Sequence, residues 1–260
     1  MMNGPIGIFD SGVGGLSVVK EILEHIEGED IVYFGDTARV PYGTKSRDTI
    51  IRFSVENTEV LLRFNIKLLV VACNTASSFS LPTLRRKFNI PIVGVLHPGV
   101  REAVRVSSNK RIGVIGTSAT ISSGSYEREI HRIAPDYSVF TQACPLFVSL
   151  VEEGWLDDEI TYQVANRYLT PLKGMGIDTL ILGCTHYPLL KHIIGRILGK
   201  KVTLVDSAHQ TAIMVKGMLK GAGFRVKEPV CKFYVSDEPE KFLLTGERFL
   251  SKKITFVRKI

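Results

Sequence analysis

The chain has 260 residues, of which 45% are hydrophobic and 23% are charged, and it carries a formal net charge of +7. This composition is typical of a globular protein with one large or two modest domains and a sizeable core. The basic residues are spread along the chain, with only short groups such as Arg85-Arg86-Lys87 and Lys252-Lys253, so we expect no nucleic-acid partner. A basic protein does suit an anionic small-molecule substrate, through electrostatic steering.

Cysteine content and hydropathy indicate where the protein works. Its four cysteines are too few and too scattered for a disulfide scaffold, and no Cys-x-x-Cys pair is present. No basic segment precedes the first apolar residues, which Asp10 interrupts, so no signal peptide is visible. The uncharged run 68–84 contains Asn74 and Pro82, which a lipid-facing helix would tolerate poorly. We expect a cytoplasmic protein with reduced thiols and no membrane association.

In the first part of the chain, short apolar runs alternate with helical patterns. We expect strands at residues 6–9, 31–34 and 92–96 and in the run that ends at Cys73, and helices at 16–26, at about 47–64 and directly after Cys73. The tripeptide His97-Pro98-Gly99 is expected to break the chain after the last of these strands. The alternation predicts an α/β fold with a mostly parallel sheet flanked by helices.

Two loops in this part contain residues suited to a ligand. The loop Asp10-Ser11-Gly12-Val13-Gly14-Gly15 leads from the first strand to a helix, and its glycines let backbone N–H groups approach an anion. It lacks the G-x-G-x-x-G pattern of a dinucleotide site. Asp10 suits a helix cap and a carboxylate at the mouth of a site about equally well. Pro41-Tyr42-Gly43 is a turn signal in a second loop between a strand and a helix, where ligand contacts are common.

A second unit begins near residue 111 and repeats the pattern of the first. Residues 111–120 resemble residues 5–12, because each is a strand that ends in glycine and small hydroxyl residues. Further strands are expected at 139–142, before Cys184 and at 201–205, with helices opening at Ser123-Gly124-Ser125, at 146–153, at 161–172 and after Cys184. The remaining chain predicts a helix from His209 to about Lys220, ended by Gly221 and Gly223, then strands at 233–235 and 255–257 around a helix near 239–249.

The repeated pattern predicts two similar α/β domains, each a mostly parallel sheet flanked by helices. Cys184 lies 111 residues after Cys73, and Ile112 lies 106 residues after Ile6, which supports a quasi-repeat. The economical division assigns residues 1–97 and 208–260 to one domain and the inserted residues 98–207 to the second. If the carboxyl edges of the two sheets face each other, a single cleft lies between the domains.

Cys73 and Cys184 occupy matching positions in the two units. Each follows an uncharged strand and precedes small polar residues that suit a helix cap. A thiol at a helix N-terminus feels the positive end of the dipole, which favours the thiolate. A single cysteine is more often a buried packing residue, as we expect for Cys144 and Cys231, which lack this context. Two cysteines in the same context instead indicate two acid/base or nucleophilic groups that approach one cleft from opposite sides.

The loop and cysteine segments form a set of four motifs: Asp10-Ser11-Gly12-Val13-Gly14-Gly15-Leu16-Ser17, Pro41-Tyr42-Gly43, Ala72-Cys73-Asn74-Thr75-Ala76 and Gly183-Cys184-Thr185-His186-Tyr187-Pro188. Together they resemble bacterial glutamate racemases, of the cofactor-independent Asp/Glu racemase superfamily, and the resemblance covers nearly the whole chain. It implies interconversion of L- and D-glutamate, with the D form used for peptidoglycan, in a homodimer. No lysine stands in these motifs as a Schiff-base anchor, so neither pyridoxal phosphate nor any other cofactor is implied.

The resemblance also implies roles for individual residues. Cys73 and Cys184 would be the two acid/base thiols, with Asp10, Glu152 and His186 as supporting groups and no metal. The implied substrate contacts are Asp10, Ser11, Pro41, Tyr42, Gly43, Asn74, Thr75, Thr185 and His186. Inverting Cα requires a base on one face of the carbon and an acid on the other, which two opposed thiols can supply. Without the resemblance, Glu152 would be interpreted as a solvated helix carboxylate.

Three other functions fit parts of the pattern. Two facing α/β lobes also form amino-acid-binding proteins of the periplasmic type, although the paired thiols and the missing export signal argue against this class. Cys73, Cys184 and His186 could ligate zinc in a hydrolase, but their spacing matches no short zinc motif. Aspartate racemase is the nearest competitor within the superfamily. The similarity of Thr185-His186-Tyr187 and Pro41-Tyr42-Gly43 to the glutamate-specific members favours glutamate.

Overall fold

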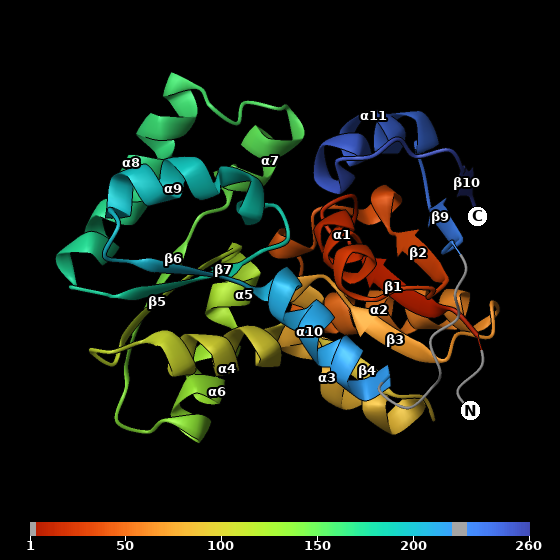
Figure 1. Ribbon diagram of the computed structural model, residues 1–260, viewed down its shortest axis with the longest axis horizontal. Helices are drawn as coiled ribbons and strands as arrows, with labels where there is room; N and C mark the ends of the chain where they lie inside the picture. Colours follow the sequence, from red (N-terminus) through yellow and green to blue (C-terminus); the bar gives the residue numbers. More distant parts are fainter. Residues whose placement is uncertain (1–3, 220–227) are drawn as a thin grey trace.

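The computed structural model describes residues 4–219 and 228–260. It contains two β-sheets in which every strand pairing is parallel, and helices lie against both of them (Figure 1). The first sheet has six strands in the order β10-β9-β2-β1-β3-β4, and the second has four in the order β6-β5-β7-β8. The prediction of an α/β fold with parallel sheets flanked by helices is confirmed.

The first sheet combines strands from both ends of the chain. Its strands are β1 (Ile6–Asp10), β2 (Ile31–Gly35), β3 (Leu68–Val71), β4 (Ile92–Gly94), β9 (Cys231–Val235) and β10 (Val257–Lys259). The helices of this half are α1 (Leu16–His25), α2 (Arg47–Leu62), α3 (Asn74–Lys87) and α11 (Pro239–Leu250), with short 3₁₀ turns at η1 (Thr37–Arg39) and η2 (Tyr42–Thr44). We refer to this half as the first lobe.

The second lobe is built from the middle of the chain. Its strands are β5 (Arg111–Gly116), β6 (Ser138–Ala143), β7 (Thr179–Gly183) and β8 (Thr203–Asp206). Its helices are α4 (Leu96–Val106), α5 (Ser118–Ser122), α6 (Ser125–Ile133), α7 (Leu146–Glu152), α8 (Glu159–Gly174) and α9 (Lys191–Leu198), with a 3₁₀ turn at η3 (Tyr187–Leu190). Helix α10 (Ser207–Leu219) follows β8, packs against α1 and α4, and runs along the junction of the lobes (Figure 1).

The buried strands explain how the sequence forms two-sided sheets. Side chains alternate along a strand, so Ile8 and Val70 contribute to one apolar cluster while Leu69 and Val71 contribute to the cluster on the opposite face. Full burial of a side chain of this size contributes roughly 1.5–3 kcal/mol. The first cluster continues through Ala212 of α10 into the second lobe, so the lobes share part of their core.

One predicted break in the chain is wrong. Residues His97, Pro98 and Gly99 lie in the first turn of α4, which spans Leu96–Val106. A proline is tolerated there because the first N–H groups of a helix have no partner within it. Helix α10 was predicted from His209 and begins at Ser207, while its predicted end at Lys220, Gly221 and Gly223 lies outside the described residues. The division at 97/98 and 207/208 stays a proposal, which the strand membership of the two sheets supports.

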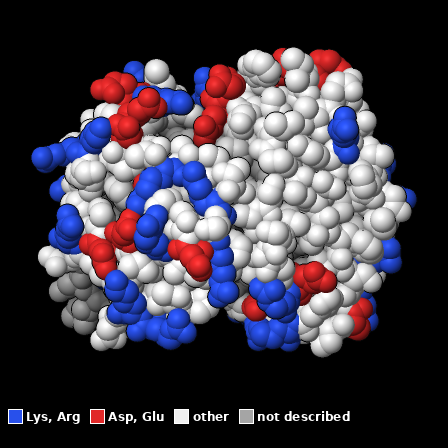
Figure 2. Space-filling model, turned by 180° about the vertical axis from the view of Figure 1, so that it is seen from behind, with Lys and Arg blue, Asp and Glu red and all other residues white. Residues whose placement is uncertain are grey.

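Charge and hydropathy add two observations about the surface. On the face drawn in Figure 2, basic side chains lie among acidic ones and do not form a single stripe. Within the described ranges, no helix has both the length and the apolar character needed to cross a membrane.

Candidate active site

Cys73 and Cys184 each lie immediately beyond the carboxyl end of a buried strand. Cys73 follows β3 and caps α3, where its Sγ accepts a hydrogen bond from the Ala76 N–H at 3.5 Å. Cys184 follows β7 at the equivalent edge of the second sheet. Both cysteines are buried and both line one pocket between the lobes. Each sheet therefore contributes one sulfur to the same cavity.

The free space between the side chains of this pocket is about 30 Å³, enough for on the order of two water molecules. Of the residues predicted to contact a substrate, all but Asp10 line it: Ser11, Pro41, Tyr42, Gly43, Asn74, Thr75, Thr185 and His186. The lining residues Gly12, Val40, Thr117 and Val148 were not predicted. The signal for Thr117 was present, because it follows β5 as Ser11 follows β1, and its hydroxyl lies 3.0 Å from that of Thr75.

The Cys73 thiol is held in its protonated form. Burial raises its pKa to about 12, and the negative charge of nearby Asp10 acts in the same direction. The hydrogen bonds with the Ala76 N–H and with the Ser11 hydroxyl, whose oxygen lies 3.7 Å from the sulfur, lower the pKa by less. The helix terminus therefore does not lower the pKa of this thiol below its usual range, because the loss of hydration outweighs the dipole.

Asp10 lies behind the pocket wall at the end of β1. It is fully buried, and its Oδ2 accepts a hydrogen bond from the Gly12 N–H at 3.0 Å. Burial raises the pKa of this carboxyl, although the charge of His186 and hydrogen bonds from loop N–H groups oppose the shift. Its Oδ1 has no hydrogen-bond partner. An unpartnered buried carboxylate oxygen close to Cys73 is suited to accept or release a proton.

Cys184 is linked to two further ionisable groups. Its Sγ lies 3.9 Å from Nδ1 of His186, and Nε2 of His186 lies 3.0 Å from Oε1 of Glu152 at the end of α7. Burial alone would lower the pKa of His186, but its hydrogen bonds with Cys184 and Glu152 raise it to about 10. Burial of the Glu152 carboxyl raises its pKa, but the hydrogen bond with His186 and nearby positive charge together outweigh burial, so the pKa of Glu152 is lowered. The three side chains form a chain of contacts that ends at the pocket.

The loops of the two lobes approach each other closely over the pocket. A Cβ added to Gly14 would lie 2.3 Å from the Thr185 hydroxyl, and one added to Gly43 would lie 2.6 Å from a carbon of Thr117. Glycine is required at both positions because no side chain fits between the lobes. Tyr42 is fixed from behind, since its hydroxyl donates to Asp36 and accepts from the Asn57 amide. The pocket is therefore bounded by closely packed loops of both lobes and by the Tyr42 side chain, whose hydroxyl is held by two hydrogen bonds.

Titratable groups from both lobes meet at the pocket. Two thiols reach it from separate lobes, and each has its own titratable neighbours, Asp10 for Cys73 and the His186–Glu152 pair for Cys184. Hydroxyls of Ser11, Thr75 and Thr185 surround the same space as donors for a carboxylate. No lysine is found among the lining residues in the described part of the chain. Acid/base groups that reach one pocket from two lobes suit the class of cofactor-independent amino-acid racemases, in which a base and an acid act on opposite faces of Cα.

Comparison with known proteins agrees with this class. A family model described as Asp/Glu/hydantoin racemase matches residues 6–215, and the chain belongs to this family. A glutamate racemase of Geobacter metallireducens is 51% identical over 260 residues, which cover 98% of this chain and 96% of that protein. The crystal structure of glutamate racemase isoform RacE1 from Bacillus anthracis matches with a TM-score of 0.94 and 40% identity, over 100% of this chain and 98% of that one.

A related structure also identifies a ligand. The crystal structure of glutamate racemase from Francisella tularensis, in complex with D-glutamate, matches with a TM-score of 0.93 and 39% identity, over 100% of this chain and 98% of that one. The aspartate racemase of Picrophilus torridus, at 16% identity and a TM-score of 0.61, shares the fold alone. The protein is an isomerase of the amino-acid racemase class.

Proposed function

We propose that this protein interconverts L- and D-glutamate by moving a proton between Cα of the substrate and two cysteines, Cys73 and Cys184. The observation that carries the proposal is the single pocket that both thiols line from separate lobes. The names of the close relatives and the D-glutamate complex of the Francisella tularensis protein support glutamate as the substrate.

In the proposed reaction one cysteine, as thiolate, removes the Cα proton while the other, as thiol, delivers a proton to the opposite face. The electron pair left at Cα delocalises into the α-carboxylate, and hydroxyls of Ser11, Thr75 and Thr185 with nearby backbone N–H groups stabilise the charge that develops there. The roles of the two cysteines exchange when the reaction runs in the other direction.

Asp10 serves Cys73 in this mechanism, and His186 with Glu152 serves Cys184. The fully buried carboxyl of Asp10, with its raised pKa and unpartnered Oδ1, supports its use as a proton acceptor for the Cys73 thiol. The 3.9 Å separation between the Cys184 sulfur and His186 Nδ1 supports proton exchange between them. Glu152 holds the imidazole by its second nitrogen, which fixes the orientation of the ring.

Isotope exchange tests the mechanism directly. Each glutamate enantiomer is incubated in deuterated water with the parent protein and with the Cys73→Ala, Cys184→Ala and Cys231→Ala variants, and both optical inversion and Cα deuteration are followed. We expect either pocket variant to stop inversion while one enantiomer still exchanges its Cα proton with the remaining cysteine. The Cys231→Ala control should behave as the parent. A pocket variant that racemises at the parent rate would remove its cysteine from the mechanism.

Three other results would each indicate one of the other functions. Tight glutamate binding without any Cα exchange by the parent protein would indicate a binding protein. Loss of activity to a chelator, with stoichiometric zinc in the pocket, would indicate the metal hydrolase. Faster inversion of aspartate than of glutamate would indicate an aspartate racemase.

The cellular context and assembly belong to the same proposal. A glutamate racemase in the cytoplasm would supply D-glutamate for peptidoglycan, so a strain without the gene should need D-glutamate to maintain its wall. We also propose a homodimer, which the mass in solution from light scattering tests directly.

A further inference from the structure

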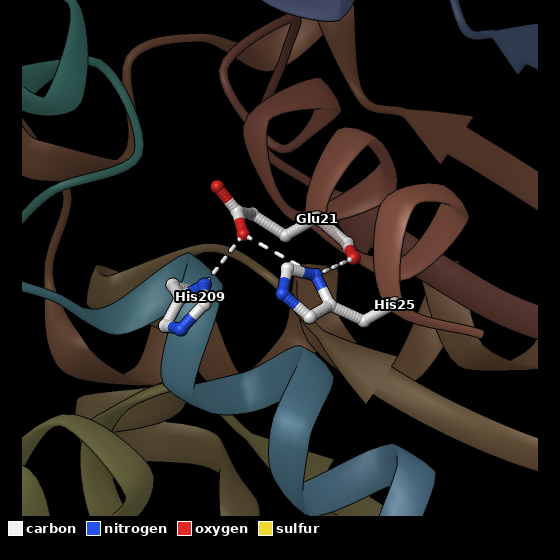
Figure 3. Close-up of side chains that lie close together, drawn as sticks. All are labelled: Glu21, His25 and His209. Atoms are coloured by element: carbon white, nitrogen blue, oxygen red, sulfur yellow. Dashed lines mark hydrogen bonds and ion pairs between the residues drawn. The ribbon is translucent and has the colours of Figure 1, made fainter.

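Two helices from different parts of the chain bring three metal-ligating side chains together outside the pocket. Glu21 and His25 lie on α1, and His209 lies on α10 (Figure 3). One ligand atom from each residue lies within 4.8 Å of the other two. In the described ranges, 4–219 and 228–260, no other group of three or more histidine, cysteine or acidic side chains meets this condition.

The hydrogen bond made by His25 leaves one of its ring nitrogens with a lone pair suited to a metal. Nδ1 of His25 lies 2.8 Å from the backbone carbonyl oxygen of Glu21. A carbonyl oxygen only accepts, so Nδ1 carries the hydrogen, and in the neutral ring Nε2 keeps its lone pair. That second nitrogen faces the His209 ring in Figure 3. Metal-bound histidines commonly have their other ring N–H held by a carbonyl in this way.

The carboxylate of Glu21 lies between the two rings. Its Oε2 is 2.8 Å from Nδ1 of His209 and 3.7 Å from Nδ1 of His25. The two imidazole rings meet edge to face, with centroids 4.7 Å apart. Without an ion, the Glu21–His209 contact is a hydrogen bond between partly exposed side chains, which contributes little to stability on its own.

We propose that Glu21, His25 and His209 form a binding site for a divalent transition-metal ion of the zinc type. Two imidazoles and one carboxylate are a common protein ligand set for zinc, which takes a water as its fourth ligand. With metal–ligand bonds of about 2.0–2.2 Å, tetrahedral ligand atoms lie about 3.4 Å apart, so the cluster must contract by roughly 1 Å. The side chains are 20%, 27% and 41% exposed for Glu21, His25 and His209, which gives them freedom to turn and gives the ion access.

An ion in this site would hold α10 against α1. Helix α1 begins directly after the loop that carries Ser11, and α10 begins directly after β8 of the second lobe. Glu21, His25 and His209 do not line the pocket. The ion would therefore fix the contact between α1 and α10 while leaving the two thiols free. Binding only to the folded state raises the thermal stability in proportion to the logarithm of the ion concentration.

Zinc titration by calorimetry tests the site. The titrated protein is the Cys73→Ala/Cys184→Ala variant, because its pocket has no thiols that could bind the ion, and this double variant is the parent in the comparisons that follow. We expect one zinc ion per chain and a higher melting temperature when zinc is added. Adding His209→Ala, or Glu21→Gln in a second variant, should weaken binding at least tenfold. Adding His192→Ala, which removes an exposed histidine on α9, is the matched control and should change nothing.

Cobalt provides a second measurement, which reports the kind of ligand atoms around the ion. The Co²⁺ spectrum should show nitrogen and oxygen ligation without thiolate charge-transfer bands, and it should vanish in the His209→Ala variant. Circular dichroism establishes that each variant is folded. Equal zinc affinity in the parent, His209→Ala and Glu21→Gln proteins, or no binding by the folded parent, would overturn the proposal and leave the cluster as a hydrogen-bonded contact between two helices.

Discussion

The contact between His186 and Glu152 should make the stability of the protein depend on pH within a defined interval. His186 Nε2 lies 3.0 Å from Glu152 Oε1, and the pKa of His186 rises from its usual 6.5 to about 10 despite its burial. A group whose folded pKa is raised stabilises the fold fully below its unfolded pKa and loses that contribution as pH rises through the folded pKa. The contribution of this imidazolium is therefore complete below 6.5 and disappears as pH approaches 10.

The size of the effect follows from the same values. A rise from 6.5 to about 10 corresponds to about 5 kcal/mol of preference for the charged ring, of which the hydrogen bond with Cys184 supplies the largest favourable part. The Glu152 side chain is 29% exposed, so solvent weakens its share. We expect the Glu152→Gln variant to lose about 1–2 kcal/mol of unfolding free energy near pH 6, between the values for an exposed and a buried ion pair.

Urea unfolding followed at several pH values from 6 to 10 measures this difference. The gap between the parent and Glu152→Gln should be largest near pH 6 and should shrink toward pH 10, because the ring becomes neutral. Glu153→Gln removes the adjacent, exposed carboxylate and should produce no such trend. If the gap is absent near pH 6, or stays constant up to pH 10, the charged pair does not exist in the folded protein and the reasoning is refuted.

Three further substitutions test the packing of the site. Tyr42→Phe removes a buried hydroxyl that donates to Asp36, and it should lower the unfolding free energy by about 1–3 kcal/mol in the same urea assay. Gly14→Ala places a Cβ 2.3 Å from a hydroxyl of the second lobe, so racemisation should fall at least a hundredfold, while Gly195→Ala, where nothing lies within 4 Å, should keep the parent rate. Cys231→Ala should leave both rate and thiol-dependent pH profile unchanged, since this cysteine does not line the pocket.

Much of the fold follows from local patterns in the sequence. Uncharged runs such as Leu68–Val71 form strands buried on both faces, and the glycines and small polar residues after them end each strand at the sheet edge. The error at His97-Pro98-Gly99 has a physical cause. Proline and glycine suggest a break wherever they occur, but the first turn of a helix needs no N–H from Pro98, and the burial of Leu96 and Val100 favours the helix.

The site was predictable in position but not in charge state. Sequence motifs located Cys73 and Cys184 at strand ends, and the structure brings both to one pocket. The effect of a helix terminus on a thiol is local and can be expected from sequence. The opposing effects of burial and of Asp10 arise from the packing of residues distant in the chain, so the raised pKa of Cys73 required the structure.

The unequal surroundings of the two cysteines bear on how a racemase of this kind would work. Because L- and D-glutamate have equal free energies and share one transition state, kcat/KM must be the same in both directions whatever the pKa of each thiol. The asymmetry can therefore change kcat and KM in each direction but not their ratio. Burial and Asp10 raise the pKa of Cys73, so in the proposed mechanism Cys73 first acts as the acid. The enantiomer whose Cα–H points away from Cys73 can then react directly, whereas the other can react only after the proton has left Cys73, and this difference should appear as unequal kcat and KM with an unchanged ratio.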